Sequence, residues 1–103
     1  MRFALIEDQA EERKRIDDML SEFCRERMIS FTTDVFTSGE EFLAAFVPMN
    51  YDVVFMDIYM DGMTGIEAAK QMRTQDSHSF LVFLTTSPEH MGDAFPPTLL
   101  IIS

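Results

Sequence analysis

The sequence of 103 residues has a single cysteine, Cys24, and no tryptophan. One thiol cannot form a disulfide within the chain, so no internal cross-link contributes to the fold. Cys24 falls in a segment with helical periodicity, where a small buried side chain is the ordinary interpretation. A reactive or metal-binding thiol is the alternative, and no second soft ligand accompanies it.

Basic residues are scarce as well. Eight Lys and Arg stand against eighteen Asp and Glu, which gives a formal net charge of −10. Binding to a nucleic-acid backbone requires clustered Lys and Arg, so we expect no such interface in this segment. An acidic chain is compatible with a site for a divalent cation, although most excess charge merely solvates a surface.

Long apolar stretches, repeats and glycine-rich motifs are also missing. No apolar run is long enough to span a bilayer, and the first residues lead into a strand-like run rather than a signal peptide. We therefore expect a cytoplasmic protein without membrane contact. Neither G-x-G-x-x-G nor G-x-x-x-x-G-K occurs, so nucleotide binding has no support. With 47% hydrophobic residues, the chain fits one domain over residues 1–103.

What the sequence does contain is an alternation of apolar runs with helical patterns. The runs 3–6, 53–56 and 80–84 are apolar without alternation, which is typical of strands buried on both faces. Residues 31–36 are β-branched and aromatic, which favours a further strand. A last strand is expected within 99–102.

Helical patterns separate these runs. Between residues 9 and 28, a single helical face carries a stripe that we expect to point inward. Ser-x-x-Glu and Thr-x-x-Glu capping boxes predict helices that start at Ser38 and Thr64, the first ending before Pro48 and the second near residue 74. Pro88 favours a short helix to about residue 95. The stripe of the first helix consists of Ile16, Met19, Leu20 and Phe23.

This order of elements predicts an α/β fold with a doubly wound parallel sheet. Strands buried on both faces need helices on both sides, and right-handed crossovers give that topology. Ligands of such sheets bind beyond the carboxyl ends of the strands, where the strand order reverses. The residues that directly follow each apolar run are therefore the candidates for a site.

Those residues are mostly acidic. Glu7 and Asp8 follow the first run, Asp57 follows the third, and Thr85 follows the fourth. Three carboxylates at one edge of a sheet repel one another, and a hard cation such as Mg²⁺ removes that repulsion. The combination predicts a Mg²⁺-assisted phosphoryl site with Asp57 as nucleophile and the Thr85 hydroxyl on a phosphate oxygen.

Each of these residues also has an ordinary interpretation. Asp57 alone could be a turn residue, Glu7 and Asp8 could favour a helix start through its dipole, and Thr85 could be a β-branched strand residue. Their joint placement after successive strands is what favours a site. His78 and His90 have no ligand partner at a suitable spacing, so we expect surface histidines.

Together these residues resemble the receiver domain of two-component response regulators, over residues 3–95. The loop at 60–65, MDGMTG, is similar to the M-P-G-M-D-G loop of that family, with Asp61 in place of the proline and Thr64 in place of the aspartate. The segments DIYMDGMTGIE and FLTTSPEH look most like receivers that precede a LytTR-type DNA-binding domain.

The resemblance implies a flavodoxin-like fold and a role for each site residue. Asp57 would accept a phosphoryl group from a sensor histidine kinase, so the chain would be a phosphoacceptor and not an enzyme. Mg²⁺ would be held by Glu7, Asp8, Asp57 and the backbone carbonyl of Tyr59. Thr85 would be the switch hydroxyl, with Thr86 as its small neighbour. The output would be regulation of transcription through a DNA-binding domain that this sequence does not include.

The sequence departs from the family at its end. Receivers carry a lysine at the end of the fifth strand, whereas this chain has no Lys or Arg after Arg73. Leu99 to Ser103 would occupy only the start of that strand, and the last helix is missing, so residues 96–103 form an atypical tail. A truncated or altered fragment and a short degenerate receiver are the two explanations. Without the last helix, apolar surface of the sheet and of its neighbouring helices would be less covered, which would favour a homo-oligomer.

Two other functions remain as alternatives. A pseudo-receiver, a protein-interaction module independent of phosphorylation, is compatible with the missing lysine. An aspartyl phosphatase would need a second aspartate two residues after the nucleophile, where this chain has Tyr59.

Overall fold

The computed structural model describes residues 1–85 and 98–102. Strands and helices alternate along the chain as the sequence predicts, and the helix expected at 88–95 lies outside the described residues. The strands are β1 (Arg2–Ile6), β2 (Thr32–Phe36), β3 (Val53–Asp57), β4 (Phe80–Thr85) and β5 (Thr98–Ile102). The helices are α1 (Ala10–Glu26), α2 (Gly39–Ala45) and α3 (Gly65–Arg73).

The five strands form one sheet in the order β2-β1-β3-β4-β5, and β1 to β4 are parallel. The strand order reverses between β1 and β3, since the chain proceeds from β1 to β2 on one side and to β3 on the other. Ile6 pairs in register with Met56, so the residues after β1 lie level with the end of β3. The doubly wound parallel topology is confirmed for these four strands.

The last strand differs from the expectation. β5 lies beside β4, where the fifth strand was expected, but it runs antiparallel, with Thr85 opposite Thr98 and Leu81 opposite Ile102. A parallel connection must cross the whole length of the sheet and usually does so with a helix, whereas an antiparallel strand only has to turn back. The strand that should be parallel is therefore reversed at this edge.

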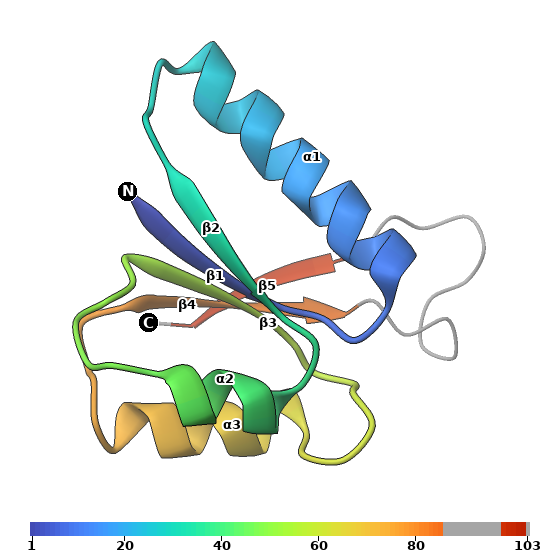
Figure 1. Ribbon diagram of the computed structural model, residues 1–103, viewed down its shortest axis with the longest axis vertical. Helices are drawn as coiled ribbons and strands as arrows, with labels where there is room; N and C mark the ends of the chain where they lie inside the picture. The colour runs from blue at the N-terminus through green and yellow to red at the C-terminus, as the bar shows by residue number, and fades with distance from the viewer. Residues whose placement is uncertain (86–97, 103) are drawn as a thin grey trace.

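The helices cover the two faces of the sheet unequally (Figure 1). Helix α1 lies on one face, and α2 and α3 lie together on the other. Phe42 is fully buried in the core between the sheet and the α2/α3 pair. Its ring centroid lies 5.4 Å from that of Phe36 and 5.3 Å from that of Phe46. On the α1 side, the rings of Phe3 and Phe55 meet edge to face at 5.6 Å. The sheet thus separates two aromatic-rich cores.

The predicted stripe of α1 is only partly correct. Ile16 is buried and Leu20 is half-buried, but Met19 and Phe23 are 47% and 48% exposed. The inward face runs through positions four residues apart to Cys24, which is fully buried as expected. Met19 and Phe23 precede that line by one residue each, so they lie on the flank of the helix.

Both predicted helix starts are confirmed. The Ser38 hydroxyl accepts a hydrogen bond from the Glu41 amide at 3.0 Å, and the Thr64 hydroxyl accepts one from the Glu67 amide at 3.2 Å. These caps satisfy amides that have no partner within the first turn. They fix where α2 and α3 begin, directly beside the carboxyl edge of the sheet.

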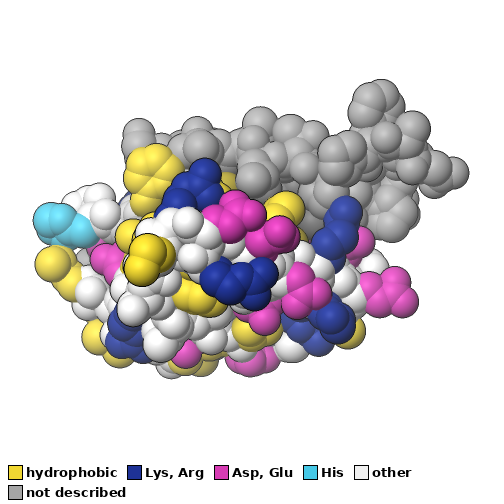
Figure 2. Space-filling view, turned by 90° about the horizontal axis from the view of Figure 1, so that it is seen from above, with side chains coloured by type: hydrophobic (Ala, Val, Ile, Leu, Met, Phe, Trp, Pro, Cys, Tyr) yellow, Lys and Arg dark blue, Asp and Glu magenta, His cyan; other side chains and the backbone are white. Residues whose placement is uncertain are grey.

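Charges of both signs are mixed on the surface that Figure 2 shows. Lys and Arg side chains alternate there with Asp and Glu, and hydrophobic side chains lie between them. On this face the positive charges are therefore interspersed with negative ones rather than gathered in one patch. In the described part of the chain, no helix has the length and apolar character required to cross a membrane.

Candidate functional site

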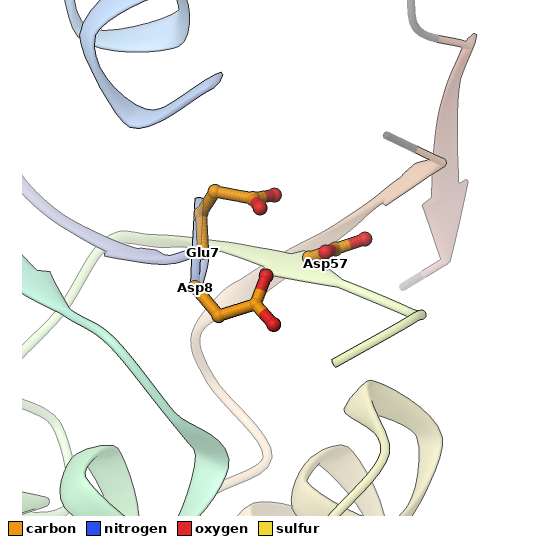
Figure 3. Close-up of side chains that lie close together, drawn as sticks. All are labelled: Glu7, Asp8 and Asp57. Atoms are coloured by element: carbon orange, nitrogen blue, oxygen red, sulfur yellow. The ribbon is translucent and has the colours of Figure 1, made fainter. Parts of the chain in front are cut away.

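Three carboxylates meet at the carboxyl edge of the sheet, where the strand order reverses. Glu7 and Asp8 follow β1, and Asp57 is the last residue of β3. Their side chains lie close together and extend to the same side of the two neighbouring strand ends (Figure 3). One carboxylate oxygen from each residue lies within 4.8 Å of the others. The predicted convergence of these three residues is thus present in the structure.

The carboxylates of the cluster are largely removed from solvent. Glu7 is fully buried, Asp57 is 1% exposed, and Asp8 is half-buried. Three negative groups at this distance and this burial oppose one another strongly. A positive charge at the centre would stabilise all three at once.

Glu7 is held by its neighbours on both sides of the strand end. Its carboxylate accepts a hydrogen bond from the Gln9 amide at 3.1 Å, and its own amide donates to the Phe36 carbonyl at 3.0 Å. The Arg13 guanidinium donates to the Glu7 carbonyl at 2.9 Å. Arg13 was not singled out from the sequence, because nothing in its spacing shows that a first-turn side chain folds back onto the preceding strand end.

The two carboxylate oxygens of Asp8 indicate whether the site fits a cation. Its Oδ2 accepts a hydrogen bond from the Asp61 amide at 3.4 Å, whereas its Oδ1 is buried and has no hydrogen-bond partner among the described residues. A buried oxygen without a partner is costly and uncommon in folded proteins. Mg²⁺ prefers oxygen ligands and is usually bound through one or two carboxylates together with water and phosphate oxygens, so the donor set fits such an ion.

The loop after Asp57 is fixed to carboxylates through alternate amides. The Tyr59 amide donates to Asp57 Oδ1 at 3.2 Å, the Asp61 amide to Asp8, and the Met63 amide to Glu40 Oε1 at 2.9 Å. Sequence reasoning missed Glu40, which lies in the first turn of α2, far from Met63 in sequence. No local pattern could have revealed it, because the contact depends on how α2 packs beside the loop.

The predicted switch residues are only partly described. Thr85 ends β4, one residue beyond Leu84, which pairs in register with Asp57. The Ile58 amide donates to the Leu84 carbonyl at 3.0 Å, so the two strand ends lie side by side. Thr86 lies outside the described residues. Tyr59, whose backbone carbonyl was expected to face the cation, has a side chain that is 42% exposed.

A parallel sheet with reversed strand order and a carboxylate cluster at its carboxyl edge defines the class of doubly wound α/β domains with an acidic site at the reversal. The family model of the response regulator receiver domain matches residues 3–94. The chain therefore belongs to the response regulator receiver domain family, as the resemblance in sequence predicted.

Individual relatives support this assignment. The sensory transduction protein LytT of Oceanobacillus iheyensis is 34% identical over 56 residues, which are 53% of this chain and 23% of that protein. The chain thus matches less than a quarter of this curated relative. The response regulator TrrA of Thermotoga maritima, solved in complex with Mg²⁺ and BeF, is 27% identical with a TM-score of 0.70, covering 90% of this chain and 76% of that one.

A second structure shows TrrA in complex with the histidine kinase ThkA. There the identity is 28% and the TM-score is 0.69, over 90% of this chain and 75% of the matched chain. A relative with the same fold is thus known in contact with a histidine kinase.

Proposed function

We propose that Asp57 accepts a phosphoryl group from a histidine kinase in a Mg²⁺-dependent reaction, and that the modified domain switches an output surface. The observation that carries the proposal is the meeting of Glu7, Asp8 and Asp57 within 4.8 Å, at the reversal of strand order. The orphaned oxygen of Asp8 adds to it, because a cation would satisfy that atom.

The residues that would hold the ion are Glu7, Asp8, Asp57 and the backbone carbonyl of Tyr59. When bound, Mg²⁺ supplies neutralisation of the charge on the phosphoryl oxygens. Asp8 follows β1 and Asp57 ends β3, so both strand ends must keep their positions for the site to form. The Tyr59 amide, which donates to Asp57 Oδ1, orients the carboxylate on which the reaction depends.

In the transfer step, a carboxylate oxygen of Asp57 attacks the phosphorus of a phosphohistidine. The new oxygen–phosphorus bond forms as the nitrogen–phosphorus bond breaks, and the departing imidazole keeps the electron pair and takes a proton from solvent. The product is an acyl phosphate on Asp57. This acyl phosphate has to be shielded from excess water, which would hydrolyse it. The burial of Asp57, which is 1% exposed, provides that shielding.

Thr85 and Thr86 are proposed to transmit the change. In this proposal a threonine hydroxyl would form a hydrogen bond with a phosphoryl oxygen once Asp57 is modified. The shift in population between two surfaces would then be the signal. The backbone register of Thr85 supports this role, since its strand neighbour Leu84 pairs with Asp57.

Partners are inferred from relatives. The TrrA–ThkA complex supports a sensor histidine kinase as the phosphodonor, and the LytT match supports a place in sensory transduction. Regulation of transcription would then require a separate DNA-binding domain. The exposed side chains of Met19 and Phe23 on α1 support self-association as a further proposal.

The test compares the chain with Asp57→Asn in ¹⁵N–¹H spectra, with Mg²⁺ and with beryllofluoride as an acyl-phosphate mimic. We expect Mg²⁺-dependent shifts around residues 57–63 and the end of β4 in the parent chain, and loss of the beryllofluoride response in Asp57→Asn. Asp18→Asn removes the same charge from an exposed position on α1 that pairs with Lys14, and it should respond like the parent. No beryllofluoride response in any variant would contradict the proposal and favour a pseudo-receiver.

A further inference from the structure

We propose that Glu40 is a positioning residue for the Mg²⁺ site: its carboxylate fixes the loop between β3 and α3 and thereby the backbone groups that face the acidic cluster. The inference rests on the proposed function and extends it to a residue outside the cluster. Glu40 belongs to α2, an element that contributes none of the three clustered carboxylates.

The contacts of Glu40 are made with the main chain of the loop. Its Oε1 accepts a hydrogen bond from the Met63 amide at 2.9 Å. A Cβ at Gly62 would be 3.0 Å from its Oε2, so the carboxylate lies directly against the Gly62 backbone. Gly62 has a φ of 78°, a left-handed conformation that glycine adopts without strain. The loop therefore passes so close to Glu40 that a side chain at position 62 would press on the carboxylate.

The three anchored amides of this loop follow a regular order. Tyr59 and Asp61 donate to Asp57 and Asp8, and two residues later Met63 donates to Glu40. The first two acceptors are the carboxylates that would bind the cation and the phosphoryl group. Once the site is occupied, the oxygens of Asp57 and Asp8 must be shared between the loop amides and the cation or phosphoryl group. This sharing weakens the hydrogen bonds that fix the first part of the loop.

Glu40 is the anchor that does not change when the cluster is occupied. Its helix is capped by Ser38, whose hydroxyl accepts from the Glu41 amide, and it is packed by Phe42, which is fully buried. A carboxylate on a fixed helix forms a charge-assisted hydrogen bond with a backbone amide, one of the stronger classes of hydrogen bond. Glu40 thus keeps the Tyr59 and Asp61 backbone at the cluster while Asp8 and Asp57 engage their ligands.

The neighbouring residue provides a matched control. Glu41 is in the same helical turn, has the same charge and is also exposed, but its carboxylate accepts from the Thr37 hydroxyl at 2.7 Å, whereas that of Glu40 accepts from the loop. Any effect of lost negative charge or of the helix dipole should be similar for the two residues. If Mg²⁺ affinity depends on the position of the loop, only substitution of Glu40 should lower it.

The experiment is a Mg²⁺ titration of the chain followed by ¹⁵N–¹H spectra, with thermal midpoints measured alongside. We expect Glu40→Ala to raise the Kd for Mg²⁺ about tenfold, the range seen when a residue that supports metal ligands is removed. Glu40→Gln keeps an acceptor oxygen and should recover part of the affinity. Glu41→Ala should stay within about twofold of the parent, since exposed charges are screened.

The outcomes separate the two proposals. If the parent binds Mg²⁺ and Glu40→Ala binds it equally well, or if Glu41→Ala is equally impaired, the role of Glu40 is contradicted while the proposed function stands. If both Glu40 variants lose affinity only in proportion to their thermal midpoints, the role is merely structural and the inference also fails. If the parent shows no Mg²⁺ response at residues 57–63, both proposals fail.

Discussion

Gly65 lies so close to Asp57 that a Cβ at position 65 would be 2.1 Å from the Asp57 carbonyl oxygen. The Gly65 amide donates to the Ile58 carbonyl at 3.0 Å, so the first turn of α3 is packed onto the end of β3. The residue that begins the helix thus sets the position of the backbone that carries the proposed phosphoacceptor.

Gly65→Ala should therefore be severely destabilising, because backbone atoms cannot move aside as a flexible side chain can. We expect a loss of about 3 kcal/mol in the free energy of unfolding, measured by urea denaturation. Gly39→Ala is the matched control, since Gly39 also begins a helix after a capping residue. Its Cβ would be 3.1 Å from the Ala68 Cβ, so a loss of only about 1 kcal/mol is expected. Equal losses would contradict this account.

The repulsion within the acidic cluster gives a second prediction. Without a divalent cation, Asp8→Asn should raise the free energy of unfolding by about 1 kcal/mol, because one of three opposed charges is removed. The asparagine amide can also donate to the remaining carboxylates. The parent should gain stability on addition of Mg²⁺ and the variant should gain less. Thermal melts in chelator and in Mg²⁺ measure both effects, and a variant less stable than the parent in chelator would refute the argument.

Asp76 connects the turn after α3 to the loop before β3. It is 3% exposed and accepts hydrogen bonds from the amides of Met49, His78 and Ser79, at 3.0, 2.7 and 3.4 Å. Burial acts to raise the pKa of Asp76, but these amides outweigh it and hold the pKa below its ordinary value of 3.8. A lowered pKa in the folded state means stability that is present above about pH 4 and lost as the pH falls further.

Asp76→Ala should accordingly destabilise the chain by about 2 kcal/mol at neutral pH, because three backbone amides, wholly or partly buried, lose their acceptor. The variant should also lose less stability than the parent on acidification below pH 4. Urea denaturation across that range measures both, with Ser77→Ala, an exposed neighbour in the same turn, as control. A parent and variant with parallel acid profiles would show that Asp76 does not contribute in this way.

The hydroxyl of Tyr51 should make the stability of the fold depend on pH in the alkaline range. Burial, the hydrogen bond from its hydroxyl to Asp34 at 2.7 Å and the charge of Asp34 together raise the pKa of Tyr51 to about 12. Because this pKa exceeds the ordinary tyrosine value of 10.0, the stability that Tyr51 contributes is complete below pH 10 and declines as the pH rises toward 12. Tyr51→Phe should lack this decline, as measured by urea denaturation in alkaline buffers. An equally steep decline in both proteins would exclude Tyr51 as its source.

Local signals and the sheet topology were predictable from the sequence. The caps at Ser38 and Thr64 depend on residues within one helical turn, so they could be recognised directly. The meeting of Asp8 and Asp57 follows from a single rule, because neighbouring parallel strands end at the same edge of their sheet. These predictions succeeded because short-range chemistry or a general rule of topology decides them.

Other features depend on tertiary packing and could not be read from the sequence. The width of the buried stripe on α1 depends on how the helix sits on the sheet, which is why Phe23 was wrongly placed inside. The antiparallel direction of β5 could not be read from the sequence either, because an apolar run gives no sign of the direction in which it pairs. The contact between Glu40 and Met63 joins two segments that no motif relates.

The most direct test of the central claim is to locate the phosphoryl group. The chain is incubated with acetyl phosphate and Mg²⁺, reduced with borohydride, which converts an acyl-phosphorylated aspartate to homoserine, and then mapped by mass spectrometry of its peptides. The account predicts homoserine at position 57 and nowhere else, dependent on Mg²⁺ and absent in Asp57→Asn. Labelling at another aspartate, or unchanged labelling of Asp57→Asn, would contradict it.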